Sequence, residues 1–339
     1  TILGSVLGGA LASRVGLKAL LAGAAVLAAS SQMLLLIVGL SEPGANSALP
    51  MLLAATGMLG LGFGIAAAPL NAFPALLFPR RADSALLALH TVIGLGFSVG
   101  PLIAGALVAR GQWVAFPGGT LVLGLGLALA AVWARLPAPA SPPVEVGGAS
   151  VSWSTLGVFG LIAVLYAFAE GSFSNWAAVF LHDGRGVEEA TAALALSAFW
   201  AALTVGRLAL AGVVARVSAE MVWLLLLPAM AGVFLLLPLA RGAWSGIGLF
   251  VLAGLSTSAF FPLTVAIASK RFPGREPLIS SLLIAALMVG VGGGSFLLGA
   301  LREQASFESI YRISAIYPAG ALALALPLVL WGRTARNNS

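Results

Sequence analysis

Near its start the chain reads Gly9-Ala-Leu-Ala-Ser-Arg14-Val-Gly16-Leu-Lys18, a short basic stretch between two apolar segments. A helix that crosses the bilayer core of about 30 Å needs about 20 apolar residues, because each residue adds about 1.5 Å. Residues 1–12 are too few to cross it. The chain therefore opens inside a membrane helix, and we expect one further apolar helix upstream of Thr1.

The composition is that of a polytopic membrane protein. Hydrophobic residues make up 60% of the chain and charged residues 8%. A soluble domain carries about 25% charged residues, about three times this share. The mean hydropathy of the chain is high, at +1.07. The net charge of +6 comes from basic residues that lie singly or in pairs between apolar stretches. This pattern is typical of topology signals and not of a nucleic-acid-binding face.

Ten apolar segments are long enough to cross a bilayer, and turn or charged residues separate them. They lie near 19–40, 50–78, 84–108, 113–134, 153–181, 190–214, 221–240, 244–269, 277–301 and 309–332. With the partial helix at 1–12, the sequence predicts an all-α membrane protein with eleven visible spans.

The basic residues predict the orientation of these spans. If the loop with Arg14 and Lys18 is cytoplasmic, alternation places 12 of the 17 Lys and Arg residues on that side, in line with the positive-inside rule. We therefore expect an integral protein of the cytoplasmic (inner) membrane whose C-terminus is cytoplasmic.

The chain divides into two halves that share sequence features. Residues 136–152 are rich in Pro, Ala, Gly and Ser and predict a cytoplasmic linker. The linker separates an N-terminal bundle at 1–135 from a six-helix bundle at 153–339. Four motifs recur in order: Pro69-Leu70 as Pro262-Leu263, Phe78-Pro79 as Phe272-Pro273, Gly100 as Gly294, and Gly105-Ala106-Leu107 as Gly299-Ala300-Leu301. Separations of 193 or 194 residues indicate two parallel repeats.

With these features the sequence resembles the major facilitator superfamily of secondary transporters, whose signature between the second and third helices is Gly-x-x-x-Asp-Arg-x-Gly-Arg-Lys. The matching positions are Gly9, Arg14, Gly16 and Lys18. Ser13 stands in place of the Asp, and Leu17 stands in place of the first of the two final basic residues. The resemblance implies a major-facilitator fold of two six-helix bundles, with the first of twelve helices absent here.

The same resemblance assigns this loop to a gate on the cytoplasmic side. We place two further basic residues in this predicted gating motif. Arg216 belongs to a weaker repeat of the loop, and Arg207 lies near the predicted cytoplasmic end of its helix. For Arg207 the alternative is anchoring, because a long side chain can reach the membrane surface.

A second resemblance covers Tyr166–Trp176 and Phe199–Arg207. These segments are similar to the seventh and eighth helices of fucose-permease-like sugar transporters. The resemblance implies a sugar as one substrate class, alongside the drugs and metabolites that related branches carry.

Glu170 is an ionisable residue within the apolar segment that begins at Trp153. A carboxylate there costs on the order of 2.5–3.5 kcal/mol on insertion, so it usually faces a cavity or a partner. In the functional interpretation it binds a substrate hydroxyl or takes up a proton. The alternative is a structural carboxylate that is hydrogen-bonded to neighbouring helices.

Polar and aromatic residues surround Glu170 in the sequence. Tyr166 lies one helical turn before it and therefore on the same face. The stretch Gly171-Ser-Phe-Ser-Asn175 weakens the helix just before Trp176, and transporters bind substrate at such discontinuities. An acid, an amide and two aromatic rings suit a sugar. The alternative for Trp176 is the aromatic belt at the membrane interface.

His90 and Asn71 lie at similar depths in two consecutive, oppositely directed spans. We expect them to meet in the cytoplasmic half of the cavity. His90 then relays a proton, or it is a neutral side chain bonded to a neighbouring carbonyl.

The glycine clusters at 60–64, 94–100 and 290–294 lie within apolar spans, so they indicate close helix packing and not phosphate binding. The sequence contains no Walker A run, no HExxH motif and no plausible Ser/His/Asp set. Cysteine is absent, so no thiolate metal site is available. We therefore expect neither an enzyme nor a cofactor or metal.

These features predict a secondary transporter that moves a small polar solute, a sugar, by rocking alternating access, with a proton as the coupling ion. The expected partners are the solute, a proton and the lipid bilayer, without nucleic acid, and the expected state is a monomer. Two alternatives stay open: proton-antiport efflux of drugs or metabolites, and a non-transporting, receptor-like membrane protein.

Overall fold

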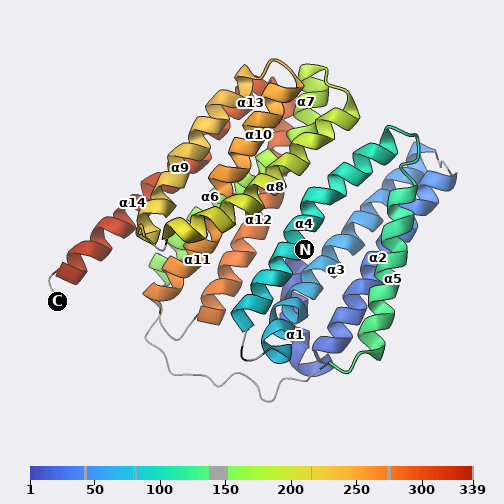
Figure 1. Ribbon diagram of the computed structural model, residues 1–339, viewed down its shortest axis with the longest axis horizontal. Helices are drawn as coiled ribbons and strands as arrows, with labels where there is room; N and C mark the ends of the chain where they lie inside the picture. The colour runs from blue at the N-terminus through green and yellow to red at the C-terminus, as the bar shows by residue number, and fades with distance from the viewer. Residues whose placement is uncertain are drawn as a thin grey trace. The chain divides into compact units, whose positions relative to one another are not determined.

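The computed structural model describes residues 1–41, 44–78, 80, 82–136, 152–214, 216–272 and 276–337. Every regular element within these residues is helical (Figure 1), so the all-α prediction is confirmed. The predicted linker lies almost wholly outside these residues, and the predicted domain boundaries stay a prediction. By contact the chain forms two units: unit 1 is Thr1–Ile93 with Ala106–Glu145, and unit 2 is Gly94–Gly105 with Val146–Ser339.

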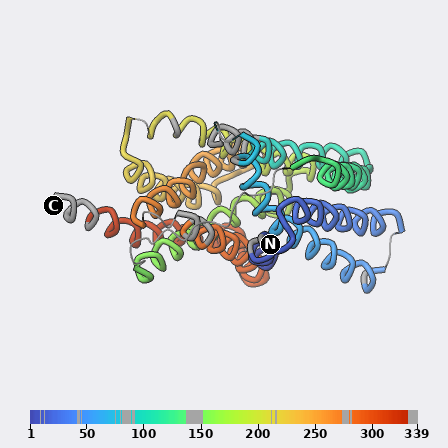
Figure 2. Tube along the Cα trace, turned by 90° about the horizontal axis from the view of Figure 1, so that it is seen from below, coloured from blue at the N-terminus to red at the C-terminus, as the bar shows by residue number. Residues whose placement is uncertain are grey.

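Within the described residues five α-helices precede the linker, and α4 contributes to both units. They are α1 (Ile2–Val15), α2 (Leu17–Ser41), α3 (Ala45–Leu77), α4 (Ala82–Val108) and α5 (Ala115–Trp133). The helices of unit 1 run back and forth, blue to green in Figure 2.

Unit 2 contains the remaining elements. They are α6 (Trp153–Ser174), α7 (Ala177–Arg185), α8 (Glu189–Val214), α9 (Ala219–Leu236), η2 (Leu237–Leu239), α10 (Ala243–Thr257), α11 (Phe260–Arg271), α12 (Glu276–Arg302), α13 (Phe307–Ser314) and α14 (Ile316–Asn337). Its core consists of two aromatic-rich clusters, one around Trp223 and Phe260 and the other around Phe180 and Tyr311.

Within the described ranges, nine segments are long and apolar enough to cross a membrane, and α1 and α4 contain shorter apolar stretches at Ile2–Ala12 and Val92–Val108. Each predicted span falls on a helix or on a pair of consecutive helices. Three predicted spans, at 153–181, 244–269 and 309–332, are each divided between two α-helices.

Three helix pairs of unit 1 recur in unit 2. In unit 1, α3 packs on α1 and α2, and α2 packs on α5. In unit 2, α10 packs on α8 and α9, and α9 packs on α14. The repeated motifs make α3 equivalent to α10 and α11, so the pairs correspond one to one. This correspondence supports the two parallel repeats predicted from the sequence.

Glycines bring α6 and α12 into close contact. A side chain added at Gly290 would overlap Val164 and Ala167, and one at Gly294 would come within 2.7 Å of Phe168. Small residues allow such close backbone approach between membrane helices. The predicted role of this glycine cluster is therefore confirmed at these two positions, whereas Gly292 has open space around it.

The break between α6 and α7 falls at Asn175 and Trp176, at the end of the stretch that the sequence predicts to weaken the helix. Both residues are tied to α12: the Asn175 amide donates to Ser295 Oγ at 2.5 Å, and the Trp176 indole donates to the Ser295 carbonyl at 3.2 Å. Side chains of the break thus supply hydrogen bonds between the two helices.

A second break separates α10 from α11, at Ser258 and Ala259. Pro262 has no backbone N–H, so the Ser258 carbonyl, four residues earlier, lacks its usual helical donor. The Ser256, Thr257 and Ser258 hydroxyls each donate to carbonyls of the preceding turn, and this back-bonding often bends helices. The span predicted at 244–269 therefore consists of two helices, and the segment Ala243–Arg271 is long and apolar enough to cross a membrane.

Arg185, the last residue of α7, binds two other parts of the chain at one end of unit 2. Its guanidinium donates to the carbonyls of Ala240 at 2.6 Å and Pro238 at 3.0 Å, in the segment between α9 and α10. It also donates to the Glu308 carboxylate at 2.5 Å and lies 4.7 Å from the centre of the Phe180 ring. Only 12% of the Arg185 side chain is exposed. Hydrogen bonds from a nearly buried guanidinium group therefore stabilise this end of unit 2.

We expect Arg185→Ala to lower the free energy of unfolding by about 2 kcal/mol, because it leaves two carbonyls and a carboxylate without their charged donor. Arg185→Lys recovers less than half of the loss, since an ammonium cannot reproduce the planar fork. Thermal unfolding in detergent measures both, with the exposed Arg241→Ala as the control. Full recovery by Lys would show that charge alone matters.

Candidate functional site

The candidate site centres on Glu170 and Tyr166, one turn apart on α6. The Tyr166 hydroxyl donates to Glu170 Oε2 and also lies 3.1 Å from the Thr257 carbonyl of α10. Tyr166 is fully buried and Glu170 is 9% exposed. The ring of Tyr166 stacks on Phe260, the first residue of α11, with 4.9 Å between ring centres. A titratable pair within a membrane span is thus packed directly against the break between α10 and α11.

Arg207 of α8 reaches the same break. Its Nε donates to the Ser258 carbonyl at 2.8 Å, the group that Pro262 leaves without a helical donor. The sequence analysis placed Arg207 in the gating motif and left anchoring open, and the structure shows it bonded to the α10–α11 break.

Sequence reasoning did not single out Thr257, Ser258 and Ser295. Thr257 and Ser258 contribute backbone carbonyls, and such a role leaves no signal in side-chain type. The hydroxyl run Ser256-Thr257-Ser258 before Pro262 was the one available signal. Ser295 lies on the glycine-rich face of α12 and accepts the Asn175 amide.

Asn175 and Trp176 lie beside this cluster in the chain but bond to α12, as described above. Trp176 also packs near Gly299 of α12, since a side chain added there would come within 3.2 Å of the indole ring. The structure therefore gives both residues protein partners, and their predicted contact with a solute stays a prediction.

In unit 1, Asn71 is an exposed residue of α3 whose amide donates to the Ala67 carbonyl, one turn earlier, at 2.8 Å. His90 belongs to α4, and its side chain lies outside the described part of the structure. The predicted meeting of these two side chains stays a prediction.

The basic loop joins α1 to α2. Gly16 ends α1 with φ of +81°, and its N–H donates to the Ala12 carbonyl at 3.2 Å. Glycine adopts positive φ without steric strain, which explains its place in the motif. Gly9 and the exposed Arg14 belong to α1, and Lys18 belongs to α2. Arg216 is exposed just after α8. The predicted gating role of these residues stays a prediction.

Comparison with known proteins agrees with this architecture. The family model of the Major Facilitator Superfamily matches residues 1–250. The chain belongs to this superfamily. It is an integral membrane protein, and the resemblance inferred from the Gly9–Lys18 motif is confirmed.

Two relatives match parts of the chain. An uncharacterized transporter, y4wD, of Sinorhizobium fredii (strain NBRC 101917 / NGR234) is 31% identical over 191 residues, which cover 53% of this chain and 48% of that protein. The fosmidomycin resistance protein of Escherichia coli (strain K12) is 29% identical over 163 residues, which cover 47% and 39%. The chain thus spans about half the length, or less, of these curated relatives.

Two solved structures share the fold. The E. coli fucose:proton symporter FucP has a TM-score of 0.63 at 15% identity, covering 95% of this chain and 86% of that one. The nucleoside transporter NupG has a TM-score of 0.73 at 15% identity, covering 96% and 88%. The predicted resemblance to fucose permease is confirmed at the level of fold. The superfamily's fold and these named relatives are those of transporters and not of enzymes.

Proposed function

We propose that the protein is a secondary transporter that moves a small polar solute, a sugar, together with a proton by alternating access. The observation that carries this proposal is the buried Tyr166–Glu170 pair against the α10–α11 break. Membership of the superfamily and the fold shared with a fucose:proton symporter support it.

Glu170 is the best candidate for the proton carrier. The other acidic residues of the described helices lie within two residues of a helix end. Glu170 instead lies inside α6 (Trp153–Ser174), with the buried residues Ala169 and Gly171 on either side of it. A charge at such a depth is costly unless it has a partner or takes up a proton, so Glu170 is suited to alternate between the two states.

Tyr166 couples the protonation of Glu170 to a hydrogen bond at the α10–α11 break. A phenol has one proton to donate. An ionised Glu170 is the stronger acceptor and holds that proton. A protonated Glu170 instead donates to the Tyr166 oxygen, which frees the Tyr166 proton for the Thr257 carbonyl at 3.1 Å. Proton uptake therefore strengthens the bond between α6 and α10.

Arg207 acts on the adjacent carbonyl. It donates to the Ser258 carbonyl, so the break between α10 and α11 receives hydrogen bonds from both α6 and α8. A broken membrane helix that is held by side chains can change its bend without losing backbone hydrogen bonds.

The remaining assignments belong to the same proposal. Asn175, Trp176, Asn71 and His90 belong to the solute or proton pathway. The Gly9–Lys18 motif and Arg216 form part of a cytoplasmic gate. We further propose that the protein works as a monomer in the inner membrane with its C-terminus in the cytoplasm.

Efflux by proton antiport is the second candidate function. Its support is the similarity to the fosmidomycin resistance protein over 163 residues. The Tyr166–Glu170 pair suits an antiporter equally well. In an antiporter, the proton and the solute compete for binding to the same conformation of the α10–α11 break.

Transport by the purified protein in liposomes tests the proposal. We expect an inward proton gradient to drive accumulation of at least one labelled hexose from a panel that also contains nucleosides and fosmidomycin. If an outward-directed proton gradient instead drives accumulation of fosmidomycin or a nucleoside inside the liposomes, the result would favour antiport. No gradient-driven movement of any panel member, by protein shown to be folded, would contradict sugar symport.

A further inference from the structure

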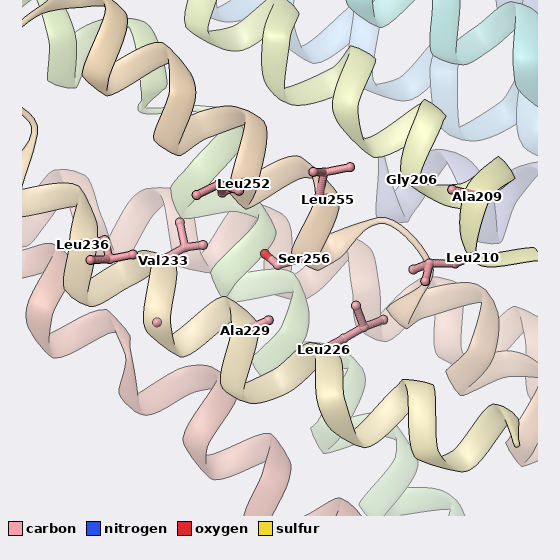
Figure 3. A pocket seen from close by; sticks show the side chains of 11 residues that line it. Gly206, Ala209, Leu210, Leu226, Ala229, Val233, Leu236, Leu252, Leu255 and Ser256 are labelled. Atoms are coloured by element: carbon pink, nitrogen blue, oxygen red, sulfur yellow. The ribbon is translucent and has the colours of Figure 1, made fainter. Parts of the chain in front are cut away.

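A polar solute needs hydrogen-bonding groups that the helices leave free. A groove between α8, α9 and α10 does not supply them (Figure 3), because its lining side chains are apolar except for Ser256. The Ser256 hydroxyl already donates to the Ala253 carbonyl at 2.9 Å. The break between α6 and α7 differs, since the Asn175 side chain is exposed there and one hydrogen bond uses only part of its capacity.

The hydroxyl of Ser295 fixes which end of the Asn175 amide faces α12. A serine hydroxyl has one proton to donate, and this one donates to the Val291 carbonyl, one turn earlier, at 2.8 Å. The Ser295 oxygen therefore faces Asn175 as an acceptor, and the amide nitrogen of Asn175 donates to it at 2.5 Å. With the Ser295 proton in use, the amide oxygen cannot take the place of the nitrogen.

The bond to Ser295 leaves the Asn175 amide with a free acceptor and a free donor. One N–H is used, so the carbonyl oxygen and the second N–H remain. Among the described residues no donor bonds that oxygen. An acceptor and a donor on one amide suit two adjacent hydroxyls, because one hydroxyl donates to the oxygen while its neighbour accepts the N–H. Adjacent hydroxyls are characteristic of sugars.

Asn175 and Glu170 lie on different sides of the helix. Asn175 caps α6 with helical backbone angles, five residues after Glu170. This separation is about 7.5 Å along the axis and about 140° around it. We propose, on the basis of the function proposed above, that Asn175 binds two adjacent hydroxyls of the sugar and that Ser295 positions the amide and thereby fixes which hydroxyl donates.

Replacement of Ser295 separates the orientation of Asn175 from the anchoring of the break. The Ser295 carbonyl accepts the Trp176 indole at 3.2 Å, and Ser295→Ala keeps this carbonyl. Only the hydroxyl is lost, so the Asn175 amide becomes free to rotate while the break stays bonded to α12. Ser295→Thr restores a hydroxyl, which in a helix also bonds a carbonyl of the preceding turn.

Exchange of a labelled hexose across liposomes without a proton gradient tests the proposal, with its monodeoxyfluoro analogues as competitors. Fluorine has no proton to donate, so it replaces only the hydroxyl that faces the amide N–H. For the unmodified protein we expect fluorine to weaken competition about fivefold at one position and less than about twofold at the adjacent one. Ser295→Ala abolishes this difference, because a rotating amide turns its N–H to either fluorine, and Ser295→Thr keeps it.

The same variants separate solute recognition from turnover. Ser295→Ala raises the KM of the parent hexose about fivefold, since a freely rotating amide must be ordered on binding, and the maximal exchange rate stays within about twofold. Asn175→Ala also abolishes the difference between the two fluorinated positions, which provides a second test if Ser295→Ala does not fold. Ser172→Ala is the matched control, because its hydroxyl likewise donates to a carbonyl one turn earlier, that of Phe168, at 2.8 Å.

Three results would overturn the proposal. The first is equal competition by both adjacent fluorinated analogues in the unmodified protein. The second is a difference that survives Ser295→Ala or Asn175→Ala, and the third is its loss in Ser172→Ala as well. Hexose exchange by the unmodified protein continues in all three, so the proposed function stands. Absence of any hexose exchange by folded protein would instead contradict the proposed function, and the role of Ser295 with it.

Discussion

Glu170→Gln abolishes proton-driven accumulation of the solute while exchange without a gradient continues. With one proton per solute, a gradient of one pH unit supports about tenfold accumulation, since a pH unit is worth about 1.4 kcal/mol. Gln keeps the size of Glu170 and still accepts the Tyr166 hydroxyl, but it cannot take up or release a proton. The variant therefore only equilibrates the solute, and uptake of labelled solute in liposomes with and without a gradient measures the difference.

Asp183→Asn is the matched control for this prediction. Asp183 is a carboxylate of the same unit, near the end of α7, and its side chain is 55% exposed. Its neutralisation leaves accumulation unchanged if Glu170 is the carrier. Accumulation by Glu170→Gln at the level of the unmodified protein would show that the proton binds elsewhere.

Gly290→Leu produces the largest expected loss of stability. An added side chain would overlap Val164 and Ala167 of α6, so α6 and α12 must separate. Overpacking typically costs 1–3 kcal/mol and occasionally more, and a backbone obstacle places this variant at about 3 kcal/mol or above. The melting temperature in detergent then falls by roughly 6–12 °C.

Gly292→Leu is the paired control on the same helix. Gly292 is exposed, and an added side chain there meets no described atom within 4 Å. This variant therefore melts within about 2 °C of the unmodified protein, because surface changes rarely exceed 0.5 kcal/mol. Equal losses from the two variants would mean that helix propensity, and not the α6–α12 contact, governs the effect.

Patterns within one helix were predictable from the sequence. Apolar length predicted the spans, and the run Gly171–Asn175 predicted the break after Ser174. The spacing of Tyr166 and Glu170 predicted their shared face, and the hydrogen bond between them follows from it. Repeated motifs predicted equivalent helices in the two halves, and the observed helix pairs agree.

Contacts between distant helices were not predictable in the same way. Ser295 lies 120 residues from Asn175, and Arg207 lies 51 residues from Ser258. Both partners depend on how α12 and α10 pack, and a backbone carbonyl is available at every residue. Pro262 alone identifies Ser258 as the carbonyl without a helical donor, but which side chain reaches that carbonyl depends on the packing of α8 against α10, so the role of Arg207 at the break required the tertiary structure.

The direction of proton movement tests the central claim most directly. A pH-sensitive dye inside liposomes reports protons that enter when a transported solute is added outside, in the absence of an imposed gradient. Sugar symport through Glu170 predicts that hexose addition acidifies the interior and that Glu170→Gln does not. Hexose uptake without acidification, or acidification that persists in Glu170→Gln, would contradict the account.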